Sequence, residues 1–282
     1  AQYMCIRYYE TDEEGIPLTY PVINERYVKA SSDDFSIIAG SPIAYWTSSN
    51  VYKAFVTGQP LESIAEPRQG VKTLDNDRFL RFWYEVSFRT IEFHAHNQEE
   101  ASASRKKWFP YNKGGEFRRW YGNNYYVVNW ENDGAEMKRL AVEKYGSVTR
   151  TITNIAYFYK PGLTWSALTT AAFSIRWFDE GFIFDSKGSS MYFRNDEERA
   201  YVIGFMNSKV ATHLLKILAP TLDFNVGPMK RLPIIKDVTY QNEINELVRE
   251  SVALAKQDWD LNETSWDFQY HAMTKGFTTV SM

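Results

Sequence analysis

The sequence predicts an α+β fold, in which a mixed, aromatic-rich β-sheet is flanked by helices and followed by a helical C-terminal extension. Between residues 70 and 190, short aromatic or β-branched runs alternate with Gly, Pro, Asn and Asp, which is typical of strands and turns. From Asp196 to Pro220, and again from Asn242 to Gln257, apolar residues recur at helical spacing. Aromatic residues make up 16% of the 282 positions, so some are expected on a binding surface.

The expected elements follow one another along the chain. Before residue 70 they are a strand over Met4–Tyr9, a helix over Ser31–Ala39, a helix over Ser49–Val56 that stops at Gly58, and a loop between Pro60 and Pro67. The later strands are expected in segments 78–88, 125–130, 154–160, 171–177 and 181–186. A helix over Ala135–Tyr145 interrupts them, because its residues lack the strand pattern.

Composition restricts the class of protein. The 32 basic and 35 acidic residues give a net charge of −3, so only a local patch of positive charge could attract an acidic partner. Cys5 is the only cysteine, which excludes a disulfide framework and a thiolate metal site and fits a cytoplasmic location. The sequence shows neither a signal peptide nor a membrane-length apolar run, so no membrane partner is expected. Because it starts at Ala1, we expect a piece of a longer protein.

Motifs for catalysis and metal binding are weak or missing. The sequence has no G-x-G fingerprint, P-loop or G-x-S-x-G elbow. His94 and His96 lack a third metal ligand at a suitable spacing, and the calcium-loop pattern that begins at Asp75 fails at Phe79. The series Asp133, Glu136 and Lys138 is similar to a nuclease motif, but it falls in one loop-to-helix segment, which favours solvated charges. We expect no catalytic residue and no metal site in this chain.

One stretch concentrates positive charge among aromatic residues. Segment 105–130 is RKKWFPYNKGGEFRRWYGNNYYVVNW. Its first half holds six cations against Glu116: Arg105, Lys106, Lys107, Lys113, Arg118 and Arg119. Cations neutralise phosphates, aromatic faces stack on bases, and a Gly pair lets a backbone approach a bulky ligand. We therefore predict phosphate contact here, in preference to a solvated basic loop.

Two other places carry binding chemistry. The polar loop QGVKTLDNDRFLR offers Lys72, Thr73, Asn76 and Arg78. These side chains suit phosphate or base contacts, although an ordinary turn explains the same residues equally well. The strand residue Arg176 either contacts bases or pairs with Asp179, and the sequence does not decide between the two.

Several long segments resemble a known family. They are, in order, QGVKTLDNDRFLRFWYEV, KWFPYNKGGEFRRWYGNNYYVVNW, FSIRWFDEGFIFDSKGSSMYF, MNSKV and LAPTLDFNVGPMKRLPI. Together they resemble the target-recognition region of adenine-specific DNA methyltransferases, above all the PglX group of BREX phage-defence systems. They are more distantly similar to TaqI-like C-terminal specificity domains. The resemblance covers roughly residues 34–268.

The resemblance implies that catalysis and DNA recognition lie in different domains. In this family an N-terminal domain binds S-adenosylmethionine and grips the flipped adenine with an Asn-Pro-Pro-Tyr type motif. No two prolines are adjacent in this chain, so that motif is missing, and no cofactor is expected to bind this chain alone. The implied layout is a connecting segment at 1–40, a DNA target-recognition domain at 41–238 and a helical extension at 239–282. Leu74 stands where the family usually has Gly, which puts close phosphate approach at that loop in doubt.

Taken together, the expected function is sequence recognition for an S-adenosylmethionine-dependent adenine methyltransferase that acts in phage defence and host DNA modification. The expected contacts to double-stranded DNA are Lys72, Thr73, Asn76, Arg78, Lys107, Tyr111, Lys113, Arg118, Arg119 and Arg176. An alternative is a protein-interaction module whose basic cleft binds another defence subunit or an acidic phage DNA mimic. A metal-dependent nuclease at Glu136 is the weakest alternative.

Overall fold

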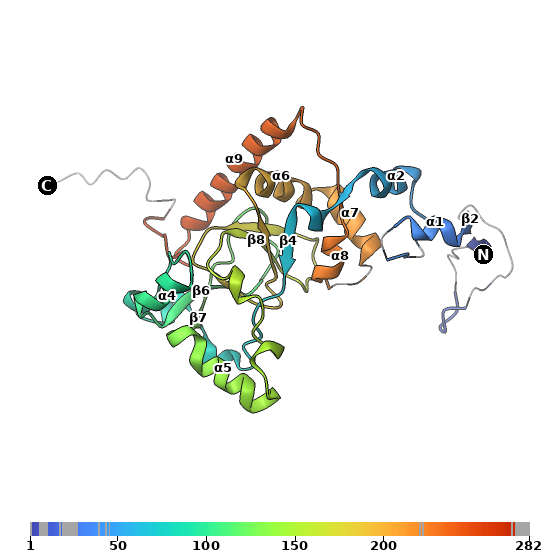
Figure 1. The fold of residues 1–282 in the computed structure, drawn as a ribbon. Coiled ribbons are helices and arrows are strands. Elements are labelled where there is room, and N and C mark those ends of the chain that lie inside the picture. The colour runs from blue at the N-terminus through green and yellow to red at the C-terminus, as the bar shows by residue number, and fades with distance from the viewer. Residues whose placement is uncertain are drawn as a thin grey trace.

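The computed structural model describes residues 46–271 except 220 and 222, residue 273, and, before residue 46, residues 2–5, 11–16, 18, 28–38, 40–42 and 44. Its helices and sheets confirm the α+β class (Figure 1). Within these residues the strands form two four-stranded sheets and two two-stranded sheets, where the sequence had predicted one mixed, aromatic-rich sheet. The expected strand at Met4–Tyr9 is described only in part, as β1, because residues 6–10 lie outside the described residues.

The first four-stranded sheet has the order β10-β6-β7-β5 and is mixed. Its strands are β5 (Leu80–Phe82), β6 (Trp108–Asn112), β7 (Tyr126–Asn129) and β10 (Ile183–Phe184). β6 pairs with β7 in an antiparallel register that sets Trp108 opposite Asn129, and it pairs with β10 in parallel. β5, β7 and β10 lie in segments that were predicted to form strands. β6 and β7 both belong to the basic, aromatic stretch 105–130, so this stretch forms the middle of the sheet.

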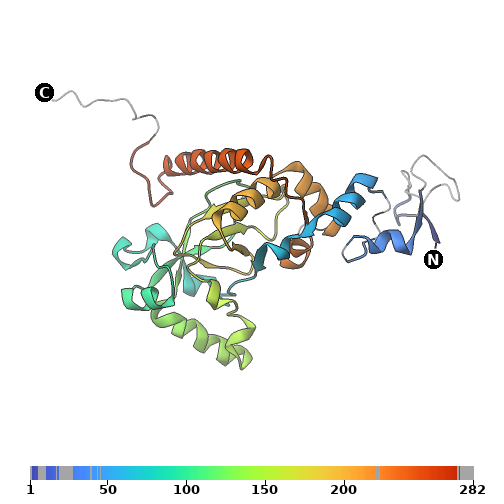
Figure 2. The same ribbon diagram turned by 45° about the horizontal axis from the view of Figure 1, so that its top comes forward.

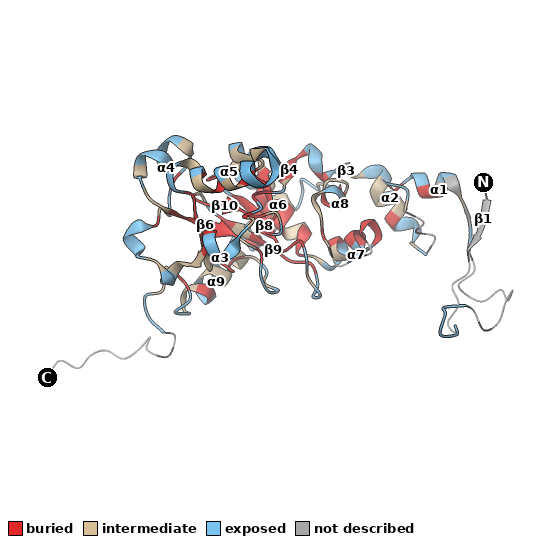
Figure 3. Ribbon diagram, turned by 90° about the horizontal axis from the view of Figure 1, so that it is seen from below, coloured by how far each residue is buried: buried red, intermediate tan, exposed pale blue. Residues whose placement is uncertain are grey.

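The second four-stranded sheet has the order β4-β11-β8-β9 and is antiparallel throughout. Its strands are β4 (Ala65–Arg68), β8 (Gly162–Trp165), β9 (Ile175–Phe178) and β11 (Ser190–Phe193). Because side chains alternate across a strand, Met191 contributes to one hydrophobic core and Tyr192 to another. The sheet thus lies between two cores, and buried residues are concentrated there (Figure 3).

Helices cover both sides of this body (Figures 1 and 2). α6 (Asp196–Met206), α7 (Lys209–Leu218) and α9 (Gln241–Asp260) lie on one side, and α5 (Glu131–Tyr145) lies on the other. α9 packs closely on α6, since a Cβ added to Gly204 would lie 2.9 Å from Cγ2 of Val248. The predicted C-terminal helix is confirmed, while the predicted domain boundaries stay a prediction.

Two predicted runs differ from the structure. The helical run after Asp196 is two helices, because Asn207 leaves the helix to bond both backbone groups of Ile175, and Ser208 then caps α7. The segment 154–160 forms a 3-10 helix over Ile155–Tyr157 and no strand, since Asn154 is left-handed with φ 58°. Its aromatic residues Phe158 and Tyr159 are core residues.

The remaining elements are short. They are β1 (Gln2–Cys5), β2 (Val28–Ser31), α1 (Ser32–Ser36), α2 (Ser49–Thr57), β3 (Gln59–Pro60), α3 (Asn76–Phe79), α4 (Gln98–Ser104), α8 (Val226–Lys230) and β12 (Pro233–Ile234). α2 ends before Gly58, as predicted, but Pro60 and Pro67 lie in β3 and β4, where a loop was expected. None of the helices in the described part of the chain combines the length and the apolar character that crossing a bilayer requires.

Candidate nucleic-acid interface

Two segments that the sequence singled out separately meet in the structure. The ammonium of Lys113, just after β6, lies 3.3 Å from Oδ1 of Asn76 at the start of α3. The same oxygen accepts a hydrogen bond from the hydroxyl of Thr73 at 2.5 Å. Asp75 holds the loop in place because its side chain caps α3 by accepting from the backbone N–H of Arg78 at 3.0 Å. The polar loop and the basic stretch therefore form one surface.

A buried carboxylate anchors this surface. Asp185, at the end of β10, is 2% exposed and accepts from Lys113 Nζ at 2.7 Å, from the Tyr111 hydroxyl at 2.9 Å and from the Lys187 backbone N–H at 2.6 Å. Burial, followed by the charge of Asp185, raises the pKa of Tyr111 well above its usual value, so its hydroxyl stays protonated and donates. The sequence had not identified Asp185. Its only signal was an acid directly after an apolar strand.

Beside this anchor lies a cavity of about 440 Å³, which we name the Lys113 pocket. Its lining residues are Asn76, Asp77, Leu80, Arg81, Phe82, Glu85, Lys113 and Tyr126. Phe82 stacks on Tyr126 with ring centroids 4.8 Å apart and on Tyr84 at 5.3 Å. The pocket therefore combines two cations and two carboxylates with an amide and aromatic faces. The cations and the amide suit contact with phosphates, and the rings suit contact with bases. Arg81, Phe82 and Tyr126 were expected to lie in strands, and no binding role was predicted for them.

The backbone at Leu74, where the resembling family usually has glycine, is strained. Leu74 has φ 66°, in the left-handed region that glycine adopts at little cost. A leucine there costs roughly 1 kcal/mol relative to glycine, and its side chain occupies space that a glycine leaves open. The doubt about close phosphate approach at this residue therefore rests on an observed conformation.

Three of the ten predicted contact residues are buried. Thr73, Tyr111 and Arg176 are 4%, 0% and 1% exposed. Their burial does not support the expectation that these three side chains contact DNA directly. Thr73 and Tyr111 instead hold Asn76 and Asp185 in position behind the surface.

Arg176 has an unusual environment. Its Nε and Nη1 atoms are buried and have no hydrogen-bond partner among the described residues. Burial, and then the nearby charge of Arg118, lower its pKa to about 10. The alternative in which Arg176 pairs with Asp179 is not found. Asp179 instead lies 3.8 Å from Arg199 and accepts from the Trp177 indole at 2.9 Å.

The other predicted cations are spread over the molecule. Ion pairs hold Arg78 to Glu136 at 2.5 Å, Lys107 to Glu131 at 3.9 Å and Arg118 to Asp258 at 3.2 Å. Lys72 and Arg119 are exposed, and neither forms an ion pair within the described residues. Arg119 lies over the ring of Phe117 at 5.4 Å. These two cations are therefore the predicted ones whose charge is most available to an acidic partner.

The nuclease series does not converge on one point. Asp133 binds Lys138 at 2.5 Å and Gln98 at 2.5 Å, whereas Glu136 binds Arg78. Among the residues that the structure describes, no group of three His, Cys, Asp or Glu side chains could hold a metal ion. Asp133 and Lys138 thus pair with each other, while Glu136 is held by Arg78.

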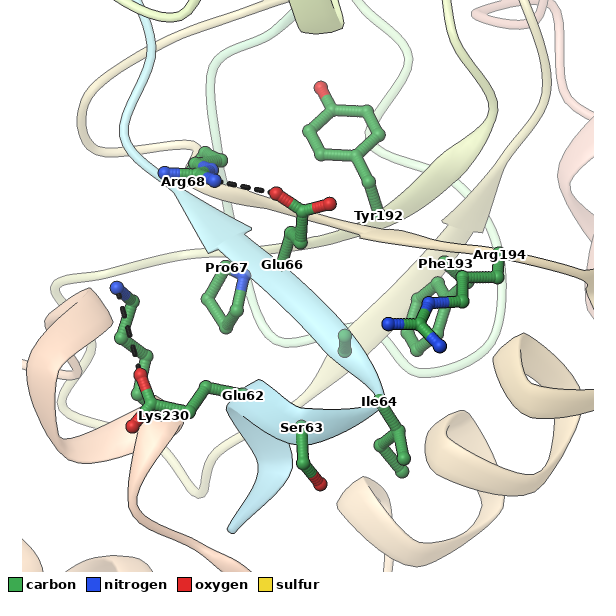
Figure 4. Close-up of a pocket in the computed structure, with 11 residues that line it drawn as sticks. Glu62, Ser63, Ile64, Glu66, Pro67, Arg68, Tyr192, Phe193, Arg194 and Lys230 are labelled. Atoms are coloured by element: carbon green, nitrogen blue, oxygen red, sulfur yellow. Dashed lines mark hydrogen bonds and ion pairs between the residues drawn. The ribbon is translucent and has the colours of Figure 1, made fainter.

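A second charged pocket lies at the edge strand β4 and includes none of the predicted residues (Figure 4). Arg68 pairs with Glu66 at 2.5 Å, and Lys230 lies 3.9 Å from Glu62. The hydroxyl of Tyr157 donates to Glu66, and this contact, followed by Arg68, lowers the pKa of that carboxyl. The four charges in these contacts neutralise one another in pairs. No predicted contact residue lines this pocket, so it is a weaker candidate than the Lys113 pocket.

Two adenine-specific methyltransferases are similar in sequence to this chain. No protein-family model matches the chain. The chain is 36% identical over 251 residues to adenine-specific methyltransferase PglX of Lacticaseibacillus casei (strain Zhang), which covers 88% of this chain and 20% of that protein. It is 34% identical over 242 residues to adenine-specific methyltransferase BrxX of Escherichia coli O9:H4 (strain HS), covering 84% of this chain and 18% of that protein. The chain thus spans about a fifth of the length of these curated relatives and is similar to one region of them.

Proposed function

We propose that this chain is a DNA target-recognition region of an adenine-specific methyltransferase of the PglX kind, acting in phage defence and host DNA modification. In this proposal the chain holds and recognises duplex DNA. Binding of S-adenosylmethionine and transfer of the methyl group belong to the rest of the enzyme. Similarity to a fifth of two methyltransferases supports such a division.

The observation that carries the proposal is the convergence at the Lys113 pocket. Asn76 and Lys113 come from segments that are 37 residues apart and meet beside stacked aromatic rings. Cationic and amide side chains contact phosphates. Aromatic side chains stack on unpaired bases. Lys72 and Arg119 add unpaired charge elsewhere on the surface, where it strengthens non-specific attraction to the duplex.

The proposal is tested by fluorescence anisotropy of a labelled duplex with the 282-residue chain at several salt concentrations. We expect affinity to fall steeply with salt, because each phosphate contact releases counterions. Lys72→Ala and Arg119→Ala should each weaken binding to all sequences and reduce the salt slope by about 1. Lys144→Ala, on the exposed end of α5, is the matched control, because it removes one charge from a place that was not predicted to bind.

Three outcomes would overturn the proposal. The first is equal loss of affinity in Lys144→Ala and in the two test variants, which would mean that only net charge matters. The second is binding to an acidic protein with no affinity for any duplex, which would favour the protein-interaction module instead. Duplex binding that is insensitive to salt would also exclude a phosphate-contacting surface.

A further inference from the structure

A cavity of about 390 Å³ lies away from the Lys113 pocket, between α4, the start of β6 and the first turn of α5. Aromatic side chains of Phe109, Trp130 and Tyr159 line it, and Arg105 and Lys106 line it too. Trp130 and Tyr159 are each 1% exposed. The cavity therefore has aromatic walls and charged groups of both signs, because the carboxylates of Glu131 and Asp133 line it as well. These two carboxylates are paired with Lys107 and Lys138.

Three polar atoms of lining residues are buried without a hydrogen-bond partner among the described residues. They are the indole nitrogen of Trp130, the hydroxyl of Tyr159 and Oε1 of Gln98. The indole can only donate, the amide oxygen can only accept, and the hydroxyl can do either. Buried polar groups are seldom left unpaired, because each costs free energy that a partner would recover. A ligand with both an acceptor and a donor would satisfy all three.

The walls of the cavity are held firmly in place. Gly134 packs on the indole of Trp130, since a Cβ there would lie 2.7 Å from ring atoms. Phe158 meets the same ring edge-on at 5.3 Å. The amide nitrogen of Gln98 donates to Asp133 at 2.5 Å, which leaves its oxygen free. Asn132 and Asp133 have φ 51° and 58°, and Gly134 has φ 66°. Such runs of left-handed residues are costly and occur preferentially at functional sites.

The charges near the cavity complete the chemistry. Arg105 is exposed, has φ 52°, and forms no ion pair within the described residues. Among the described residues, the ammonium of Lys106 donates to the backbone oxygen of Arg89. Arg is well suited to phosphate because its planar group donates two parallel hydrogen bonds. We propose that this cavity binds a nucleobase that carries a phosphate, with the base between the aromatic walls and the phosphate at Arg105.

Two sources can supply this chemistry, namely a free nucleotide or a base extruded from a DNA duplex. The test follows the indole N–H signals of the ¹⁵N-labelled chain by NMR, with the Trp130 signal assigned by its loss in Trp130→Phe. The probes are AMP, GMP, CMP and TMP, inorganic phosphate, a fully paired duplex and a duplex with a single-nucleotide bulge. We expect the Trp130 signal to shift with at least one monophosphate or with the bulged duplex. A shift with the bulged duplex alone assigns the source to extruded bases.

Variants separate recognition of the base from recognition of the phosphate. Tyr159→Phe should weaken monophosphate binding about fivefold, the usual effect of one neutral hydrogen bond. Tyr192→Phe is the matched control, because Tyr192 is also buried with an unpartnered hydroxyl but does not line this cavity. Arg105→Ala should weaken monophosphates about tenfold and leave nucleosides unchanged.

Three results would overturn the inference. One is a Trp130 signal that does not shift with any probe at millimolar concentration, which would indicate that ordered water satisfies the polar groups of the cavity. Another is an equal shift with inorganic phosphate alone, which would mean an anion site without base recognition. The third is identical behaviour of Tyr159→Phe and Tyr192→Phe. The monophosphate titrations need no duplex, so their outcome is independent of duplex binding at the Lys113 pocket.

Discussion

Replacing Lys113 by Met should separate its structural role from its binding role. The side chain of Lys113 is 26% exposed and the side chain of its partner Asp185 only 4%, so the pair is intermediate between a surface pair and a buried one. Surface pairs contribute at most about 1 kcal/mol, whereas removing one partner of a buried pair costs about 3–5 kcal/mol. We therefore expect Lys113→Met to lower the free energy of unfolding by about 2 kcal/mol, measured by urea denaturation.

The complementary change, Asp185→Asn, keeps an acceptor for Tyr111 and leaves Lys113 charged and partly in solvent. It should cost about 1 kcal/mol, because only the charge of the interaction is lost. A double-mutant cycle between the two positions should give a coupling energy of about 1 kcal/mol. The exposed pair between Lys187 and Asp223, at 3.5 Å, is the control and should couple by less than about 0.5 kcal/mol.

Duplex binding distinguishes the two roles, because the variants should act in opposite directions. Lys113→Met removes a cation and should weaken binding with a smaller salt slope, while Asp185→Asn frees the cation and should maintain or strengthen binding. Equal loss of affinity in both variants, with an unchanged salt slope, would refute direct contact by Lys113. It would show that the pair acts only by shaping the surface.

Three further predictions concern stability and pH. Gly134→Ala should lower the free energy of unfolding by about 3 kcal/mol, because it combines φ 66° with a Cβ 2.7 Å from the Trp130 ring; calorimetry showing a loss below about 1 kcal/mol would contradict the packing described. Leu74→Gly should raise the free energy of unfolding by up to about 1 kcal/mol in urea, since it relieves φ 66°, and a clear loss would mean that side-chain packing outweighs the strain. The pKa of Glu66 is lowered from 4.5, first by the Tyr157 hydroxyl and then by the adjacent guanidinium, so its contribution is present above pH 4.5 and lost as pH falls through the folded-state pKa. Glu66→Gln should therefore cost about 0.5 kcal/mol at pH 7 and progressively less as the pH falls below 4.5, and a difference independent of pH would contradict the linkage.

Local signals predicted the helices well. α2 stops at Gly58, α9 covers the predicted run to Gln257, and the regular part of α5 begins after Gly134, as its sequence indicated. These features depend on residues within a few positions of one another, such as caps and apolar spacing. The division of the strands among separate sheets depends on which strands pair across long stretches of chain. The periodicity of a single strand does not encode this pairing.

The candidate site shows the same limit. The sequence identified Asn76 and Lys113 by type and charge, but not that they meet. Asp185 was missed because a lone acid after a strand has no distinctive spacing. Arg176 was expected on a surface because its strand alternates, yet both faces of that sheet are buried. Burial on both faces is a property of the assembled layers, and a strand's own alternation does not reveal it.

The contacts of Asp185 determine when this surface forms during folding. Its bonds to Lys113 and Tyr111 close chain separations of 72 and 74 residues. Contacts of such high order form late, after the loop-closure entropy of the intervening chain has been overcome. An isolated peptide spanning 105–130 would therefore retain the positive charge of this region but not its geometry. Selectivity among DNA sequences should emerge only with the folded domain, whereas bare attraction to polyanions should persist in the peptide.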